Sequence, residues 1–175
     1  MNKFDISKLE KSVREVPDFP KPGIKFKDIT PILINPKLLS MSIEALAYHV
    51  DSSSIDKIIG IDARGFIFGS LLANLLGKGF IPVRKEGKLP WQTESQAYDL
   101  EYGKSVIEIH KDAIDPGERI LIVDDLLATG GTAEAAVKLV EKLSGTVDSL
   151  IFFIELEFLN GRELLKNTKV IELMI

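Results

Sequence analysis

The sequence contains no cysteine among its 175 residues, which excludes disulfide bonds, thiolate zinc sites and a cysteine nucleophile. A cysteine-free chain is typical of a reducing compartment, so we expect a cytoplasmic location. The sequence also lacks an apolar run of the ~20 residues that a membrane span needs, and no membrane partner is expected. The N-terminal residues 1–16 intersperse charges with Ile6, Leu9, Val13 and Val16, a pattern unlike a signal or transit peptide.

No charge of one sign dominates the chain. Lys and Arg total 22 against 26 Asp and Glu, which gives a net charge of −4. Without a basic field, nucleic acid is not an expected partner. An anionic ligand must instead be held by a local cation cluster, by backbone amides or by a metal ion. With 45% hydrophobic residues and no internal repeat, residues 1–175 are expected to form one domain.

Apolar strands that alternate with helices predict an α/β fold, with a mostly parallel, twisted sheet covered by helices on both faces. Asp5 is expected to cap a first helix that ends before Pro17, and the proline-rich residues 17–23 to form a rigid extended loop. Asn35 and Gly77 are the expected N-terminal and C-terminal caps of later helices. Strands are predicted at 56–61, 80–84, 118–123, 147–156 and 169–173, and helices at 36–50, 66–76, 132–143 and 161–166.

One segment interrupts this alternation. Residues 98–101 and 106–110 flank the tripeptide at 102–104, which has the composition of a hairpin turn. Ligands of parallel sheets bind beyond the carboxyl ends of the strands, and a hairpin inserted after a parallel strand is expected to cover that edge. We therefore predict a flap over residues 85–110 and an N-terminal hood over residues 1–35.

The segment VDDLLATGGT, residues 123–132, carries the strongest chemical signal. Its glycines allow backbone amides to converge on an anion, and the following helix adds its dipole. The expected phosphate cradle consists of Ala128, Thr129, Gly130, Gly131 and Thr132.

The two acidic residues of this segment, Asp124 and Asp125, are expected to end the preceding strand, and the sequence suggests no other partner for them. Carboxylates bind phosphate poorly, so the pair is expected to accept sugar hydroxyls, with Mg²⁺ as a further ligand. The motif thus predicts an enzyme that acts on a phosphorylated sugar. The ordinary alternative is a capped helix beside a solvated acidic pair, and Gly-Lys-Ser/Thr of a Walker A loop is absent.

Two cationic segments also follow predicted strands. The turn containing Ala63 and Arg64 can present amides and a guanidinium to an anion. Arg84, Lys85 and Lys88 form a basic cluster suited to a polyanion. The alternatives are an ordinary turn and a solvated loop.

These segments resemble the purine/pyrimidine phosphoribosyltransferase family. The similarity extends in order along nearly the whole chain, and its N-terminal and flap segments point to the adenine-specific branch. The segments that carry it are 17–31, 60–69, 82–90, 100–114, 123–132 and 154–162.

The resemblance implies a type I phosphoribosyltransferase-like fold and the salvage reaction that converts adenine and 5-phosphoribosyl 1-diphosphate into AMP and diphosphate. It implies Mg²⁺ as a cofactor, bound mainly through the substrate rather than by certain protein ligands. A small chain with an exposed flap is also expected to form a homodimer.

The resemblance further assigns roles to the candidate residues. Asp124 and Asp125 would hold the ribose hydroxyls and residues 128–132 the 5-phosphate. The diphosphate would be bound by Ala63, Arg64, Arg84, Lys85 and Lys88. Arg64, Arg84 and the flap residue Glu101 are the implied catalytic residues, and Tyr102 lies in the flap beside Glu101.

The implied adenine site combines Phe26 and Leu156, which would clamp the two base faces, with backbone groups of Lys25 and Lys27. Each assignment has a plainer alternative: Phe26 and Leu156 as core residues, and Glu101 as a solvated turn residue. Position 27 is commonly arginine in the family, and Trp91 stands where a small residue is usual.

Two rival functions are considered. Hypoxanthine and guanine enzymes usually carry a lysine after the last strands, and residues 154–159 contain none. Ligand-sensing regulators that share this fold normally carry an added DNA-binding domain, for which this sequence has no segment.

Overall fold

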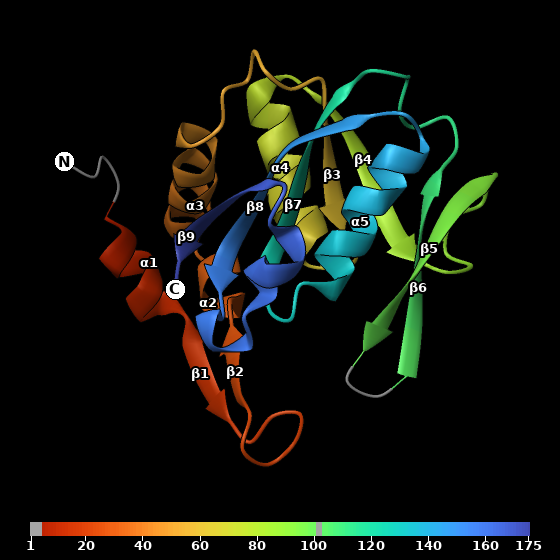
Figure 1. Cartoon of the computed structure of the whole chain (residues 1–175). Helices are drawn as coiled ribbons and strands as arrows, with labels where there is room; N and C mark the ends of the chain where they lie inside the picture. The colour runs from red at the N-terminus through yellow and green to blue at the C-terminus, as the bar shows by residue number, and fades with distance from the viewer. Residues whose placement is uncertain (1–4, 101–102) are drawn as a thin grey trace.

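A twisted seven-stranded sheet forms the centre of the protein in a computed structural model that describes residues 5–100 and 103–175 (Figure 1). The strand order is β5-β6-β4-β3-β7-β8-β9. The five parallel strands are β3 (Lys57–Ile61), β4 (Gly79–Lys85), β7 (Arg119–Leu127), β8 (Thr146–Glu155) and β9 (Lys169–Met174). The antiparallel hairpin β5 (Thr93–Leu100) and β6 (Gly103–His110) joins the sheet at β4.

Helices cover both faces of the sheet, as the apolar strands require. On one face, α3 (Pro36–Tyr48) and α4 (Gly65–Leu76) enclose a core that includes Ile58. On the other face, α5 (Gly131–Lys142) packs over a second core that includes Ile59. Adjacent residues of one strand thus enter opposite cores, as the pleat dictates. The predicted fold class is confirmed.

The predicted caps are present at three helix ends. The Asp5 side chain accepts from the amide of Lys8 at the start of α1 (Ile6–Ser12). The Asn35 side chain accepts from two amides of the first turn of α3, and Gly77 ends α4 in the left-handed conformation at φ 66°. These local signals place the helices within two residues of their predicted bounds, except that the pattern of the first helix ran on past Ser12.

The hood differs from its prediction. Val16, which has helical spacing in the sequence, lies instead on β1 (Arg14–Pro17) and pairs with Phe26 on β2 (Lys25–Asp28). The proline-rich stretch between them is a hairpin loop rather than an extended segment. It is closed by the Gly23 amide, which donates to Asp18 Oδ1 at 2.7 Å. Antiparallel pairing of the flanking strands requires this reversal of the chain.

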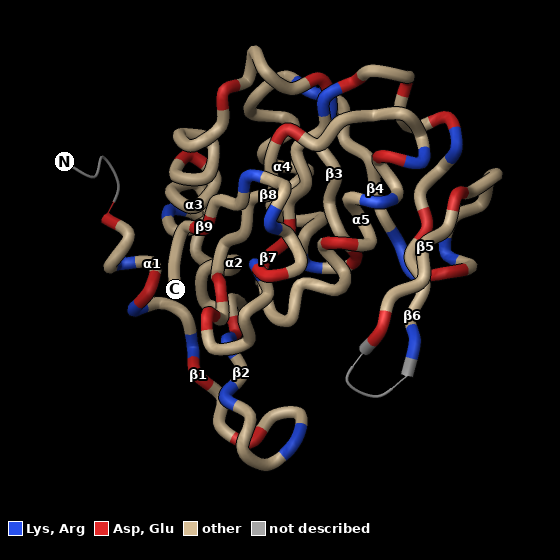
Figure 2. Tube along the Cα trace, in the orientation of Figure 1, with Lys and Arg blue, Asp and Glu red and all other residues tan. Residues whose placement is uncertain are grey.

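The remaining elements are short. They are α2 (Thr30–Leu33) after β2, and the 3₁₀ turns η1 (Glu157–Leu159) and η2 (Gly161–Leu165) between β8 and β9. Lysine and arginine positions are interspersed with acidic positions along the trace (Figure 2). Among the residues that the structure describes, no helix has the length and apolar character needed to cross a membrane.

Candidate active site

Two adjoining hollows lie at the carboxyl ends of β3, β4 and β7. The smaller, of about 80 Å³, is surrounded by residues 126–133 together with Asp124 and Phe152. The larger, of about 300 Å³, has Asp124, Leu126 and Thr132 in common with it. Its lining is Ile61, Asp62, Ala63, Arg64, Lys85, Tyr98, Ile107, Asp124, Asp125, Leu126 and Thr132. The sheet edge predicted to bind ligand is therefore the one that is hollowed.

The phosphate loop, residues 128–132, surrounds the smaller hollow together with its neighbours. Gly130 adopts φ 85°, a left-handed conformation that glycine accepts at low cost, and it directly precedes α5. No side chain among residues 5–100 and 103–175 caps this helix start, which leaves its first amides able to donate to an anion. The structure thus brings the five predicted cradle residues together around one small space.

The acidic pair lies within β7 rather than at its end, because the strand continues to Leu127. This corrects the predicted boundary. Asp125 is 5% exposed, and its amide donates to Asp124 Oδ1 at 2.9 Å. Gly65, at the start of α4, allows this approach: a Cβ there would lie 2.8 Å from both Asp124 Oδ1 and the Val123 carbonyl oxygen.

Burial shifts the titration of both carboxyls. Loss of hydration and the neighbouring Asp125 carboxylate raise the pKa of Asp124 well above its ordinary value. Loss of hydration also raises the pKa of Asp125, while the Arg64 guanidinium opposes that rise. An ionised Asp124 is consequently a cost to the folded state.

Replacing Asp124 with asparagine is expected to raise the melting temperature at neutral pH. The elevated pKa means that ionisation opposes folding above that pKa, and this opposition disappears as the pH falls below the unfolded value of about 3.9. A gain of about 1 kcal/mol would appear as roughly 2–4 °C. Melting curves from pH 4 to 8, with Asp148→Asn as the control, measure the effect. A gain independent of pH would contradict the assigned cause.

Arg64 lies between the acidic pair and the hood. Its Nε atom is 2.8 Å from Asp125 Oδ2, and its guanidinium carbon is 5.2 Å from the centroid of the Phe26 ring. The expectation that the acidic pair lacks a partner is therefore wrong. The ion pair does not have hydrogen-bond geometry, so the buried Oδ2 atom retains capacity to accept a hydrogen bond.

The basic cluster divides in the structure. Arg84 Nε donates to Asp62 Oδ2 at 3.2 Å, and Arg84 Nη1 donates to the Lys88 carbonyl oxygen at 3.1 Å. Lys85 lines the larger hollow, whereas the exposed Lys88 is not among its lining residues. Ala63 lies in the lining beside a cis peptide bond to Asp62.

The hood brings its candidate residues to the same edge. Phe26 is half-buried on β2, where its ring meets Arg64 and, edge-on at 5.2 Å, Phe19. The amino groups of Lys25 and Lys27 lie 3.3 and 3.1 Å from the Glu15 carboxylate. Both lysine side chains thus form ion pairs with Glu15. The prediction for Lys25 and Lys27 concerned their backbone groups, which these ion pairs do not involve.

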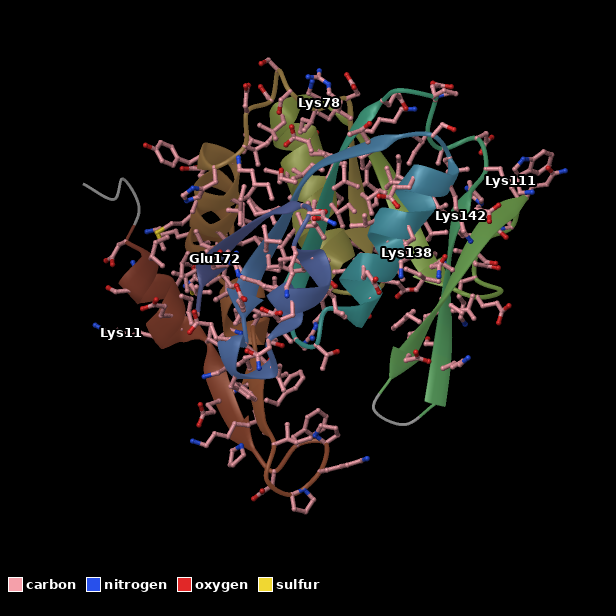
Figure 3. The ribbon with its side chains drawn as sticks, in the orientation of Figure 1. Lys11, Lys78, Lys111, Lys138, Lys142 and Glu172 are labelled. Atoms are coloured by element: carbon pink, nitrogen blue, oxygen red, sulfur yellow. The ribbon has the colours of Figure 1, made fainter. Side chains whose placement is uncertain are left out.

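The remaining candidates have different outcomes. Leu156 is half-buried, and its amide donates to the Leu127 carbonyl oxygen at 2.9 Å, so it lies beside the end of β7. Glu101 and Tyr102 fall outside the described residues. The base of their hairpin is fixed to α5, because the Lys142 amino group donates to the Ser95 carbonyl oxygen at 2.7 Å (Figure 3).

Some residues at the site were not predicted from the sequence. Tyr98 and Asp62 belong to the larger hollow, and Gly161 packs against the phosphate loop. The buried Glu155 forms an ion pair with the partly exposed Arg162, the residue that follows Gly161. Tyr98 and Asp62 carry no local signal, whereas the Gly-Arg pair at 161–162 is visible in a segment that the family resemblance used.

A family model described as a phosphoribosyl transferase domain matches residues 29–155. Adenine phosphoribosyltransferase of Thermoanaerobacter pseudethanolicus is 54% identical over 169 residues, which cover 97% of this chain and 98% of that protein. The chain belongs to the adenine phosphoribosyltransferase family. This confirms the resemblance inferred from the motifs.

Solved structures of family members have the same fold. The adenine phosphoribosyltransferase structure from Thermoanaerobacter pseudethanolicus matches with a TM-score of 0.94 at 54% identity, over 97% of this chain and 98% of that one. The Saccharomyces cerevisiae enzyme, complexed with an imino-altritol bisphosphate and adenine, matches with a TM-score of 0.93 at 44% identity, over 96% and 97%. The Trypanosoma brucei enzyme, in complex with AMP, pyrophosphate and ribose-5-phosphate, has 0.88 at 26% identity, over 99% and 81%.

Proposed function

We propose that this cleft transfers the phosphoribosyl group of 5-phosphoribosyl 1-diphosphate to adenine, giving AMP and diphosphate in purine salvage. The observation that carries the proposal is the juxtaposition of two hollows, an amide cradle of residues 128–132 and a neighbouring space lined by Asp124 and Asp125. A phosphate beside hydroxyl acceptors is the pattern of a ribose 5-phosphate. Relatives crystallised with adenine and with AMP support the choice of base.

The proposed mechanism is mainly one of positioning and electrostatics. Cleavage of the bond between ribose C1 and the diphosphate leaves positive charge on the sugar and negative charge on the leaving group. Arg64, Arg84 and Lys85 surround the larger hollow or support its wall, and with Ala63 and Lys88 they would bind the diphosphate as it departs. The cradle would anchor the 5-phosphate, remote from the reacting carbon, so that its binding energy orients the ring.

The acidic pair would fix the ribose. Asp125 Oδ2 is buried and accepts no hydrogen bond from the described residues, so a ribose hydroxyl can supply the missing donor. That role requires the pair to share Arg64 with the substrate. We propose that the guanidinium turns from Asp125 toward the diphosphate when the substrate enters.

Adenine would bind between the hood and the end of β8. Phe26 would present its ring to one base face and Leu156 its side chain to the other, with backbone groups of Lys25 and Lys27 at the base edge. Within the part of the chain that the structure describes, the outer edge of β2 has no strand partner, which suits this role. We propose that the flap, with Glu101 and Tyr102, closes over the site, excludes water and brings Glu101 to share a proton at the purine.

Phe26→Ala is expected to raise the KM for adenine by about 10-fold or more, with a much smaller change in the KM for 5-phosphoribosyl 1-diphosphate. Base stacking on an aromatic ring contributes about 1–3 kcal/mol per base. Steady-state kinetics with each substrate varied in turn measure the split. Phe19→Ala is the control, because Phe19 contacts the same ring from the side and is 52% exposed. Equal changes in both KM values would identify Phe26 as a core residue.

The residues present suit a substrate-bound Mg²⁺. Carboxylate oxygens are its preferred protein ligands, and Mg²⁺ commonly binds one or two of them together with substrate phosphates. Asp124 and Asp125 supply two such carboxylates. The described residues contain no group of three or more acidic, His or Cys side chains that could hold a metal ion. When bound, the ion would neutralise diphosphate charge.

The base preference is tested by supplying Mg²⁺, 5-phosphoribosyl 1-diphosphate and each of adenine, hypoxanthine and guanine in turn. Formation of AMP alone is expected. Preferential formation of IMP or GMP would refute adenine as the acceptor, and binding of the diphosphate without turnover of any base would favour a ligand sensor.

We also propose a homodimer in the cytoplasm. The described surface exposes several large apolar side chains, among them Leu75 at 52% on α4 and Tyr48 at 62% at the end of α3. Such residues gather in interfaces when they are contiguous. Sedimentation equilibrium at assay concentration is expected to give twice the chain mass of 19.4 kDa. A single species of the chain mass would refute the dimer.

A further inference from the structure

An ion cluster built around one buried carboxylate lies beside the active site without being part of it. Arg162 Nε donates to both carboxylate oxygens of Glu155, at 2.8 and 2.7 Å, and Glu155 is only 4% exposed. Arg162 also donates to Glu172 on β9, labelled in Figure 3, and to the Val170 carbonyl oxygen at 3.3 Å. We define Glu155, Arg162 and Glu172 as the ion cluster.

We infer that Arg162 is a positioning residue, which through Glu155 holds the phosphate loop and the adenine-side segment in one arrangement. The adenine-side segment is residues 156–160, which begin with Leu156. The inference rests on the proposed function, because only that function makes the two segments substrate-binding. Arg162 itself is not among the residues proposed to bind substrate. It concerns how the phosphate loop and the adenine-side segment are held at a fixed position relative to each other.

The link to the phosphate loop runs through Gly161, which immediately precedes Arg162. Gly161 is buried against the loop so closely that a Cβ on it would collide with the Ala128 carbonyl oxygen and lie 3.1 Å from the Gly130 nitrogen. Conversely, a Cβ on Gly130 would lie 3.1 Å from the Gly161 carbonyl carbon. The loop is therefore supported by backbone whose place depends on η2.

The link to the adenine side runs through Glu155, the last residue of β8. Leu156 follows it and donates its amide to Leu127, the residue that ends β7 and precedes the phosphate loop. The chain then reverses at Asn160, which has φ 53°, and returns to Gly161. The Arg162–Glu155 pair joins the two ends of this six-residue segment, residues 156–161.

The chemistry of the cluster suits a fixed geometry. A guanidinium binds a carboxylate through two parallel donors, which sets orientation as well as distance. The Glu155 carboxylate is almost fully buried and loses hydration, whereas the Arg162 side chain is 42% exposed. The cost of dehydrating the carboxylate offsets much of the attraction between the two charges. An ion pair in this place is thus better explained by the geometry that it imposes than by the free energy of unfolding.

The experiment compares Arg162→Lys, which keeps the charge and loses the fork, with two single-sided variants. Gly161→Ala displaces the phosphate loop alone, and Leu156→Ala removes adenine contact alone. Arg119→Lys is the matched control, since Arg119 forms an exposed ion pair with Asp56 at the opposite end of the sheet. Circular dichroism confirms folding, and assays run well below the lowest melting temperature. Calorimetry measures the affinity for ribose 5-phosphate.

Arg162→Lys is expected to raise the KM for both substrates and to lower kcat/KM by on the order of 10- to 100-fold, as a displacement of about 1 Å can do. Its affinity for ribose 5-phosphate is expected to fall about 10-fold. Gly161→Ala should affect the diphosphate substrate and Leu156→Ala the base, while Arg119→Lys stays within twofold. If Arg162→Lys does not fold, Glu155→Gln/Arg162→Gln replaces it, because that pair leaves no buried charge unpaired.

A folded variant with both KM values and the ribose 5-phosphate affinity within twofold of the wild type would overturn the inference. An effect on one substrate alone would also overturn it, because the residue would then support only one loop. If the wild type fails to turn over adenine, the proposed function fails. Binding of ribose 5-phosphate to Arg162→Lys then still decides whether Arg162 positions the phosphate loop.

Discussion

Asp125→Ala is expected to lower kcat/KM for 5-phosphoribosyl 1-diphosphate by at least about 10²-fold, the size of losing one key electrostatic contact. Asp125 is 5% exposed and 2.8 Å from Arg64, so the substitution removes a hydroxyl acceptor and also releases a cation inside the cleft. Both effects act on the sugar and its leaving group. The KM for adenine is expected to change less, since the proposed role of Asp125 is to hold the ribose.

Initial rates with each substrate varied in turn provide the measurement. Asp125→Asn separates charge from shape, because the amide keeps the volume and loses the negative charge. Asp148→Asn, on the first half of β8, is a control remote from both hollows. Near-wild-type turnover of either Asp125 variant would remove the acidic pair from the proposed mechanism.

Gly130→Ala is expected to raise the KM for 5-phosphoribosyl 1-diphosphate by on the order of 10²-fold, as a displaced binding group can. The added Cβ would meet Gly161 backbone, and the residue would keep a left-handed φ of 85°. Left-handed backbone costs a non-glycine residue roughly 1–2 kcal/mol. The loop has to move away from Gly161, and this movement would carry the α5 amides away from the proposed phosphate position.

Gly117→Ala is a matched control for this substitution. Gly117 has φ 87°, close to that of Gly130, but a Cβ there would meet no atom within 4 Å. Both variants should therefore lose similar stability from backbone strain, and only Gly130→Ala should lose substrate affinity. Equal KM values in the two variants would mean that the loop tolerates the contact and that strain alone is at work.

The parts of the fold that follow from local chemistry were predictable from the sequence. Asn35 marks a helix start through its side chain, which accepts from two amides of the first turn, and Gly77 marks a helix end through its left-handed backbone. Apolar runs such as that of β7 identify buried parallel strands without any partner being known. The phosphate loop is equally local, since its glycines and its helix lie within a few residues of one another. Its position at the carboxyl edge of the sheet followed from the strand alternation.

The rest depends on contacts between distant segments. β1 and β2 form because Val16 and Phe26 face each other across a loop, and neither segment has a strand pattern by itself. The same holds for the Arg64–Asp125 ion pair and for the contact between Gly130 and Gly161. No periodicity in one stretch of sequence can show which charge will meet which across the fold.

The first helix of the hood packs against a strand from the far end of the sequence. Leu9 on α1 is fully buried in a core that also contains Met174 on β9, near the other terminus, and Figure 1 shows α1 and β9 at the same side of the molecule. During synthesis the apolar face of α1 is therefore covered only after β9 has left the ribosome. The strands that carry residues 128–132 therefore leave the ribosome before the hood that carries Phe26 can pack on the sheet.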